Sequence, residues 1–180
     1  VPVINVIDPM IEAVIADNAI HKVGVIATKT TIASGTYREK FSRRKPTLQY
    51  AELATPLLAS MIEEGYYNDN ISNAVLESYL SNEALKNIDA LVLACTHYPL
   101  IKKEIDAYYK QQVKIFDSAE VVAAKLKWIL EKENLFALSK SADDIFYVSD
   151  YTESFRHTTR IFYNKEVRLE YYNIWEANKS

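Results

Sequence analysis

Short runs of apolar and β-branched residues recur along the chain, and longer stretches with a helical spacing of apolar positions separate them. The short runs predict strands at Val1–Ile7, Val23–Ala27, Thr47–Leu53, Asp89–Ala94 and Val113–Phe116. Strands that alternate with helices are typical of an α/β fold with a largely parallel sheet. We therefore expect a mostly parallel sheet flanked by helices.

The longer stretches predict helices at Thr31–Arg43, Pro56–Glu64, Asn73–Asn87, Pro99–Lys110 and Ser118–Asn134. Thr55 precedes a proline that suits the first turn of the second helix, so Thr55 is its expected cap. The last of these helices carries apolar residues on one side, namely Val121, Val122, Leu126, Ile129 and Leu130. Beyond it we expect a strand at Ile145–Ser149, a polar helical stretch that contains Phe155 and Phe162, and an aromatic ending.

Composition excludes some classes of function. The chain has 180 residues, of which 49% are hydrophobic and 25% charged, as in an ordinary soluble globular protein. Its formal net charge of −3 gives no general attraction to nucleic acid or to acidic membranes. No apolar run approaches the roughly 20 residues that a membrane-spanning helix needs. We expect neither nucleic acid nor a membrane as a partner.

The chain contains one cysteine, Cys95. A single cysteine cannot form a disulfide within the chain, and a free thiol is typical of a reducing compartment, so we expect a cytoplasmic protein. The histidines His21, His97 and His157 lie far apart in sequence and lack the spacing of a metal site with Cys95. We therefore expect no metal ion.

Cys95 follows the apolar run that predicts the fourth strand and precedes Pro99, which places the thiol in a strand-to-helix loop. Free backbone N–H groups and the positive end of a helix favour a thiolate, and His97 is close enough in sequence to be its charge partner or proton relay. Free cysteines are more often buried and unreactive. The Cys-Thr-His-x-Pro context at a strand end favours a reactive thiol instead. If Cys95 is catalytic we expect a depressed thiolate pKa, and if Cys95 is only a core residue we expect an inert thiol.

Thr28 and Thr31 follow the strand predicted at Val23–Ala27, at the start of a predicted helix. Their hydroxyls and nearby backbone N–H groups would suit a carboxylate. An ordinary helix cap is the alternative, and the two residues by themselves favour it. This loop and the Cys95 loop both follow the carboxyl ends of predicted parallel strands, where open α/β sheets bind ligands.

Three segments match, in order and spacing, segments of one enzyme family. Residues 91–100, Leu-Val-Leu-Ala-Cys-Thr-His-Tyr-Pro-Leu, are similar to its second cysteine motif. Residues 23–37, Val-Gly-Val-Ile-Ala-Thr-Lys-Thr-Thr-Ile-Ala-Ser-Gly-Thr-Tyr, are similar to its first substrate loop, and residues 55–65, Thr-Pro-Leu-Leu-Ala-Ser-Met-Ile-Glu-Glu-Gly, to its acidic helix. The chain thus resembles the cofactor-independent glutamate racemases. It departs from them at Ala27, where the family usually has glycine, and at Thr55, where it usually has cysteine.

The resemblance implies a reaction without a cofactor, in which two cysteines act on opposite faces of the α-carbon of glutamate. Cys95 matches the second cysteine, which deprotonates the L-isomer. His97 matches the histidine that assists this cysteine, and Glu63 matches the carboxylate that orients and charges the histidine, with the adjacent Glu64 as an alternative. Such a relay is physically sound, because a carboxylate favours imidazolium and a nearby imidazolium favours thiolate.

The resemblance also implies the substrate site and the partners. Thr28 and Thr31 match threonines that hold a substrate carboxylate, and Thr96 matches a residue that binds the substrate through its hydroxyl and N–H. The implied product is D-glutamate for peptidoglycan, and the intact enzyme would be a homodimer. Threonines that bind a carboxylate do not measure side-chain length, so a racemase for aspartate or another small amino acid stays open. A non-catalytic binding or regulatory module, with Cys95 as a core residue, is the alternative from another class.

Finally, the resemblance implies a domain plan, because glutamate racemases pair two similar α/β halves around the active site. Residues 1–8 resemble the crossover from the first half, residues 9–116 the complete second half, and residues 117–180 the segment that returns to complete the first. On this plan the first half and its cysteine are absent. We then expect the chain alone to be inactive, and apolar faces within residues 118–180 to lack a partner in the chain.

Overall fold

The computed structural model describes residues 2–67, 69–137, 139, 144–152, 155–156, 159–160, 163 and 165–173. His157 and Phe162, which the sequence analysis names, lie outside the described residues. The chain divides into two compact units, Val1–Leu135 and Phe136–Ser180. Among the described helices, none has the length and apolar character needed to cross a bilayer.

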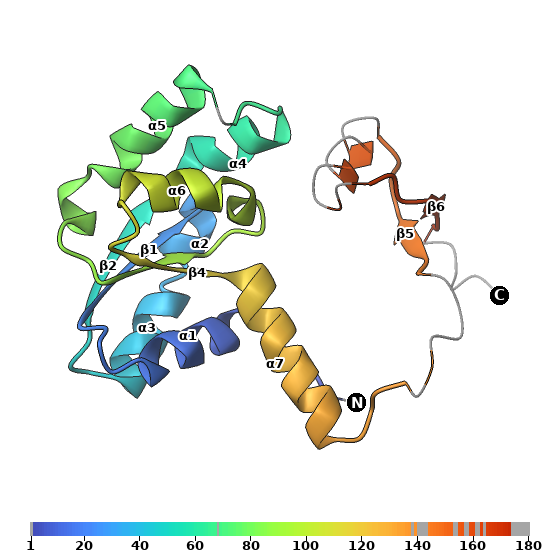
Figure 1. Cartoon of the computed structure of the whole chain (residues 1–180), viewed down its shortest axis with the longest axis horizontal. Helices are drawn as coiled ribbons and strands as arrows, with labels where there is room; N and C mark the ends of the chain where they lie inside the picture. Colours follow the sequence, from blue (N-terminus) through green and yellow to red (C-terminus); the bar gives the residue numbers. More distant parts are fainter. Residues whose placement is uncertain are drawn as a thin grey trace. The chain divides into compact units, whose positions relative to one another are not determined.

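The first unit is built on a four-stranded parallel sheet (Figure 1). Its strands are β1 (Lys22–Ala27), β2 (Gln49–Ala54), β3 (Ala90–Leu93) and β4 (Lys114–Asp117), which lie side by side in the order β2-β1-β3-β4. The prediction of a mostly parallel α/β sheet is confirmed. The strands expected at Val23–Ala27, Asp89–Ala94 and Val113–Phe116 correspond to β1, β3 and β4, and the one expected at Thr47–Leu53 corresponds to β2.

Helices cover both faces of this sheet. They are α1 (Ile7–Ala16), α2 (Lys29–Ala33), α3 (Thr36–Arg44), α4 (Pro56–Glu63), α5 (Asn70–Leu80), α6 (Lys102–Tyr108) and α7 (Ser118–Lys132). Single 3₁₀ turns occur at Glu83–Leu85 and Tyr98–Ile101. In Figure 1, α1 and α3 lie on one side of the sheet, and α4, α5 and α6 lie on the other.

Successive strand residues point to opposite sides of the sheet, so a run in which nearly every residue is apolar makes both faces apolar. On β1, Val23 and Val25 pack with buried residues of α1 and α3, whereas Ile26 packs with buried residues of α4 and α5. Gly24 shares the side of Ile26, where Leu85 also lies. The continuous apolar run of β1 therefore reflects a strand that is buried on both faces.

The prediction of a strand at Val1–Ile7 is wrong. The side-chain carbonyl of Asn5 accepts hydrogen bonds from the backbone N–H groups of Ile7, at 3.0 Å, and Asp8, at 2.7 Å, just where α1 begins. This local bonding favours a helix start over an extended chain. The helix then buries an apolar stripe on the sheet, formed by Met10, Ile11 and Val14.

The helix expected at Thr31–Arg43 is two helices, α2 and α3. Gly35 separates them with a φ of 65°, a left-handed conformation that glycine adopts easily and other residues rarely. The helix expected at Asn73–Asn87 likewise ends earlier, at Leu80, and Asn87 has a φ of 55°. The helices at Pro56–Glu64 and Ser118–Asn134 are confirmed as α4 and α7.

The apolar side of α7 is only partly covered within the described residues. Val121 packs against the core between the sheet and α1. Leu126 and Trp128, by contrast, are 44% and 50% exposed. Lys125 and Lys132 place their ammonium groups 4.6 Å and 5.1 Å from the centre of the Trp128 ring, an arrangement in which cations cover the ring faces.

The second unit has a small parallel pair of strands, β5 (Phe146–Val148) and β6 (Leu169–Tyr171). The strand expected at Ile145–Ser149 is thereby confirmed. The Phe146 ring packs edge to face on Tyr163, with 5.1 Å between the ring centres.

The close packing at Gly24 predicts a loss of stability on adding one methyl group. A Cβ on Gly24 would approach Leu85 Cδ2 to 2.9 Å and Ile88 Cδ1 to 3.1 Å, inside the core. We expect Gly24→Ala to lower the free energy of unfolding by about 1–3 kcal/mol, as overpacked cores do. Urea denaturation measures it. In the double variant with Leu85→Val, the loss should be smaller than the sum of the two single losses, and a neutral Gly24→Ala would contradict this packing.

Candidate active site

The loops after β1 and β3 begin at the carboxyl ends of two neighbouring parallel strands, at the same end of the sheet. The backbone N–H of Ala94, just past β3, donates to the carbonyl of Ile26 at 2.9 Å. The two connections then lead to opposite faces of the sheet. After β1, α3 packs in the core with α1, whereas after β3 the turn at Tyr98–Ile101 packs in the core with α4 on the other face. Open α/β sheets bind ligands where the connections of two adjacent strands diverge in this way.

Cys95 lies in the loop after β3, as predicted, and is half-buried. The backbone N–H groups of Thr96, His97 and Tyr98 favour the thiolate, that is, they lower the pKa of the thiol. Burial of the thiol opposes them and is the largest influence, and the negative charge of Glu63 acts in the same direction as burial. The pKa of Cys95 is therefore raised, because desolvation outweighs the N–H groups, and the depressed pKa expected for a catalytic thiol is not found.

His97 lies between Cys95 and an acidic side chain. Its Nδ1 is 3.7 Å from Cys95 Sγ, and its Nε2 is 2.9 Å from Glu63 Oε1. Glu63 ends α4, whose buried Leu58 and Ile62 belong to the same core cluster as Tyr98. From the sequence, Glu63 and Glu64 were both candidates for this carboxylate, and the residue in contact with His97 is Glu63. The three side chains thus form a continuous path from carboxylate to thiol.

Thr28 and Thr31 lie at the start of α2. The Thr28 side chain accepts from the N–H of Thr31 at 3.4 Å, and the two hydroxyl oxygens are 3.1 Å apart. Thr28 is thus a helix cap, which was the alternative to a ligand role for these threonines. Both threonines are partly buried, and Thr96, beside the thiol, is exposed. The topology brings the Thr28 and Cys95 loops to neighbouring strand ends.

Thr55 and Tyr98 make a polar contact that no local sequence pattern predicts. Thr55 is the N-cap residue of α4, as predicted, but its side chain makes no hydrogen bond to the helix. Instead its hydroxyl lies 2.7 Å from that of Tyr98, and both residues are fully buried. Sequence offered one signal: a threonine where the similar enzymes usually have cysteine, at the end of a strand.

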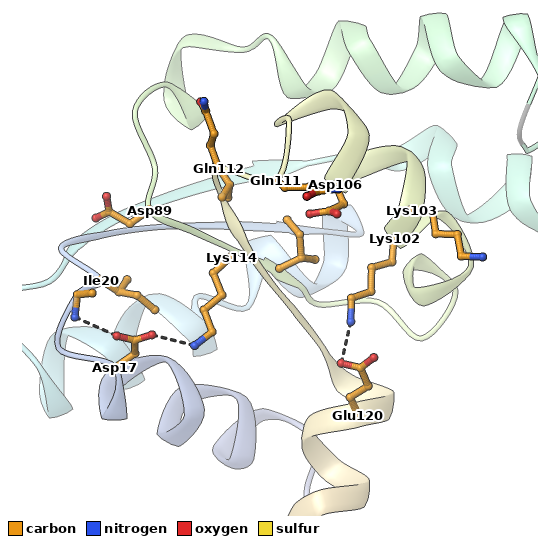
Figure 2. Close-up of a pocket in the computed structure, with 13 residues that line it drawn as sticks. Asp17, Ile20, Asp89, Lys102, Lys103, Asp106, Gln111, Gln112, Lys114 and Glu120 are labelled. Carbon is orange, nitrogen blue, oxygen red and sulfur yellow. Dashed lines mark hydrogen bonds and ion pairs between the residues drawn. The ribbon is translucent and has the colours of Figure 1, made fainter.

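A cavity of about 820 Å³ contains none of the predicted site residues (Figure 2). It runs along β4, and two of its lysines pair with carboxylates. Lys114 Nζ lies 2.8 Å from Asp17 Oδ2, and Lys102 Nζ lies 2.7 Å from Glu120 Oε2. Because these lysines are already neutralised by carboxylates, the loops at the strand ends are the better candidate for an anionic ligand.

Comparison with known proteins identifies the family. The sequence pattern of the Asp/Glu/Hydantoin racemases matches residues 1–126. This chain belongs to the Asp/Glu/Hydantoin racemase family. Its parallel sheet and its Cys95 loop are therefore features of a racemase-family protein.

Two curated relatives and one solved structure show the extent of the similarity. A glutamate racemase of Chlorobaculum parvum is 37% identical over 147 residues, which cover 81% of this racemase-family chain and 54% of the relative. A glutamate racemase of Chlorobaculum tepidum is 35% identical over 168 residues, which cover 93% of this chain and 62% of the relative. A crystal structure of the Francisella tularensis glutamate racemase with D-glutamate superposes with a TM-score of 0.85 at 35% identity, and the match covers 95% of this chain and 64% of that one. The chain thus spans between half and two thirds of the length of these relatives.

The raised pKa of Cys95 predicts how its thiol reacts with pH. A group whose charged form is disfavoured stays neutral over a wider pH range, so little thiolate exists at neutral pH. We expect the rate of alkylation by iodoacetamide to keep rising through the pH at which an unperturbed cysteine levels off. Mass spectrometry of the chain over a pH series measures it, with free cysteine as the reference. A plateau at lower pH than the reference would contradict this environment.

Proposed function

We propose that this chain supplies one of the two acid–base groups of a cofactor-independent glutamate racemase. The observation that carries the proposal is the path from Glu63 through His97 to Cys95, with contacts of 2.9 Å and 3.7 Å. It ends at a thiol beside the strand-end loops in which open α/β sheets bind ligands. Membership of the Asp/Glu/Hydantoin racemase family supports the same reaction class.

The chemistry needs a group that can both take and give a proton at the α-carbon. In its neutral form, which burial favours, Cys95 can donate the thiol proton to a carbanion. To act as a base, Cys95 first passes that proton to His97, and the carboxylate of Glu63 stabilises the imidazolium that forms. The thiolate then removes the α-proton of L-glutamate, and the sulfur regains a proton as the substrate becomes a carbanion.

Thr28, Thr31 and Thr96 are the proposed substrate ligands. Thr96 is exposed next to the thiol, and the hydroxyls of Thr28 and Thr31 lie together at the neighbouring strand end. Hydroxyl and N–H donors would hold the carboxylate of an amino acid close to Cys95. Such ligands do not measure side-chain length, and aspartate is therefore the second candidate substrate.

Inversion also needs an acid–base group on the opposite face of the substrate, and Cys95 is the only cysteine in the 180 residues. Our proposal therefore assigns to this chain the acid–base group on one face of the α-carbon, which removes the proton of the L-isomer and can return a proton to that same face, whereas protonation to the D-isomer needs the group on the opposite face. For the whole enzyme we infer a homodimer that makes D-glutamate for peptidoglycan in the cytoplasm. The glutamate racemases similar to this chain support the substrate.

Replacing Glu63 tests the relay. Loss of its charge removes direct repulsion of the thiolate, which would speed alkylation, but it also removes the support for imidazolium, which would slow it. Our proposal requires the second effect to dominate. We expect Glu63→Gln to slow alkylation of Cys95 at neutral pH by about threefold to fivefold, because a half-exposed pair contributes up to about 1 kcal/mol. Glu64→Gln, on the exposed neighbour, is the matched control and should not change the rate. Faster alkylation in Glu63→Gln would refute the relay.

Ligand protection tests the substrate. We expect L-glutamate to protect Cys95 from iodoacetamide, because the thiol lies beside the proposed substrate ligands. At equal concentration it should protect more strongly than L-aspartate, because the similar proteins are glutamate racemases. Thr31→Val should weaken this protection, since it removes a hydroxyl from the proposed carboxylate site, whereas Thr152→Val, in the second unit, should not. Mass spectrometry quantifies the alkylated fraction. Stronger protection by aspartate would support the second candidate, and no protection by either would support the non-catalytic module.

A further inference from the structure

Thr55 and Tyr98 form a buried hydroxyl pair that no step of the proposed chemistry uses. They are 43 residues apart in the sequence, and their side-chain oxygens lie 2.7 Å apart. Tyr98 lies in an apolar cluster with Leu58 and Ile62 of α4. A polar pair in such a core is tolerated only when its hydrogen bonds are made.

Two backbone carbonyls complete the network. The Thr55 hydroxyl can donate to the carbonyl of Ala27 at 3.3 Å, and the Tyr98 hydroxyl can donate to the carbonyl of Thr55 at 3.2 Å. Each hydroxyl carries one proton. Either Tyr98 donates to the Thr55 hydroxyl and Thr55 donates to Ala27, or Thr55 donates to Tyr98 and Tyr98 donates to the Thr55 carbonyl. Both arrangements keep the 2.7 Å hydrogen bond and leave no proton unused.

This network joins three segments of the proposed site. Ala27 directly precedes Thr28 and also accepts the N–H of Thr55 at 2.8 Å. Thr55 directly precedes α4, which carries Glu63 at its other end. Tyr98 directly follows His97, and its N–H donates to the carbonyl of Cys95 at 3.2 Å.

We propose that the Thr55 and Tyr98 hydroxyls are a positioning device that holds α4 against the Cys95 loop and so keeps Glu63 in contact with His97. The inference rests on the proposed function, because the position of Glu63 affects the reaction only if the relay from Glu63 through His97 to Cys95 operates. Neither hydroxyl is placed to touch a substrate, since both residues are fully buried. Burial also raises the pKa of Tyr98 to about 12, so its phenol keeps the proton that the network needs.

Thr55→Val and Tyr98→Phe remove one hydroxyl each with little change in shape. In either variant the remaining hydroxyl can still donate to a backbone carbonyl, so the fold should persist. We expect both variants to slow alkylation of Cys95 at neutral pH by about threefold, in the range of couplings within one hydrogen-bond network. Thr55→Ser, which keeps the hydroxyl, should restore the rate. In a Glu63→Gln background neither variant should slow it further.

Tyr109→Phe is the matched control. The Tyr109 hydroxyl is buried against the same apolar cluster but has no hydrogen-bond partner in the structure. Its removal should leave the alkylation rate unchanged. If the pair only stabilised the loop, its loss would expose Cys95 and speed alkylation. Faster alkylation in Tyr98→Phe where Glu63→Gln slows it, or a rate equal to that of Tyr109→Phe, would overturn the positioning role.

The NMR signals of the His97 ring separate this inference from the proposed function. We expect Thr55→Val and Tyr98→Phe to shift these signals, assigned with His97→Gln, and Tyr109→Phe to leave them in place. Unshifted signals overturn the positioning role whatever the relay does. Shifted signals together with faster alkylation in Glu63→Gln would instead keep the positioning role and remove the relay.

Discussion

The parallel pairing of β1 with β3 is the constraint on which the candidate site depends. Its register places Ile26 beside Leu93, and continuing it by two residues brings Thr28 level with Cys95. A slip of one residue would exchange side chains between the two buried faces, one of which has room for Leu85 only because Gly24 lies there, so the packing of the two cores fixes the register. The same packing that stabilises the sheet therefore fixes which loops meet.

The thiol illustrates how burial and hydrogen bonding compete at such a strand end. Three backbone N–H groups favour the thiolate of Cys95, yet burial and the Glu63 carboxylate raise its pKa. A thiol that is neutral at rest suits a group that must also return a proton to a carbanion. His97, at 3.7 Å from the sulfur, then provides the place to which that proton can go.

Sequence predicted what depends on local apolar pattern. The runs of β1 and β3 identified a parallel α/β fold, and the position of Cys95 after β3 followed from them. The break between α2 and α3 was missed because it depends on one residue, Gly35, with a positive φ. The first strand was misassigned because side-chain bonds of Asn5 begin a helix in an otherwise strand-like segment.

The rest depended on contacts across the fold. From its neighbours in the sequence, Thr55 is predicted to cap a helix. Its hydroxyl instead contacts that of Tyr98, 43 residues away, and no local pattern connects the two residues. The choice between Glu63 and Glu64 required the orientation of α4 against the turn after His97. The sign of the pKa shift at Cys95 required its burial, which composition and spacing do not give.

Hydrogen exchange at the α-carbon of glutamate tests the central claim most directly. A thiolate that removes the α-proton in D₂O would return deuterium from the solvent to the same face. With the purified chain, proton NMR should show loss of the α-proton signal of L-glutamate, with no D-glutamate formed and no loss from D-glutamate. Exchange that is absent, or that persists unchanged in Cys95→Ser, would contradict an acid–base role for Cys95.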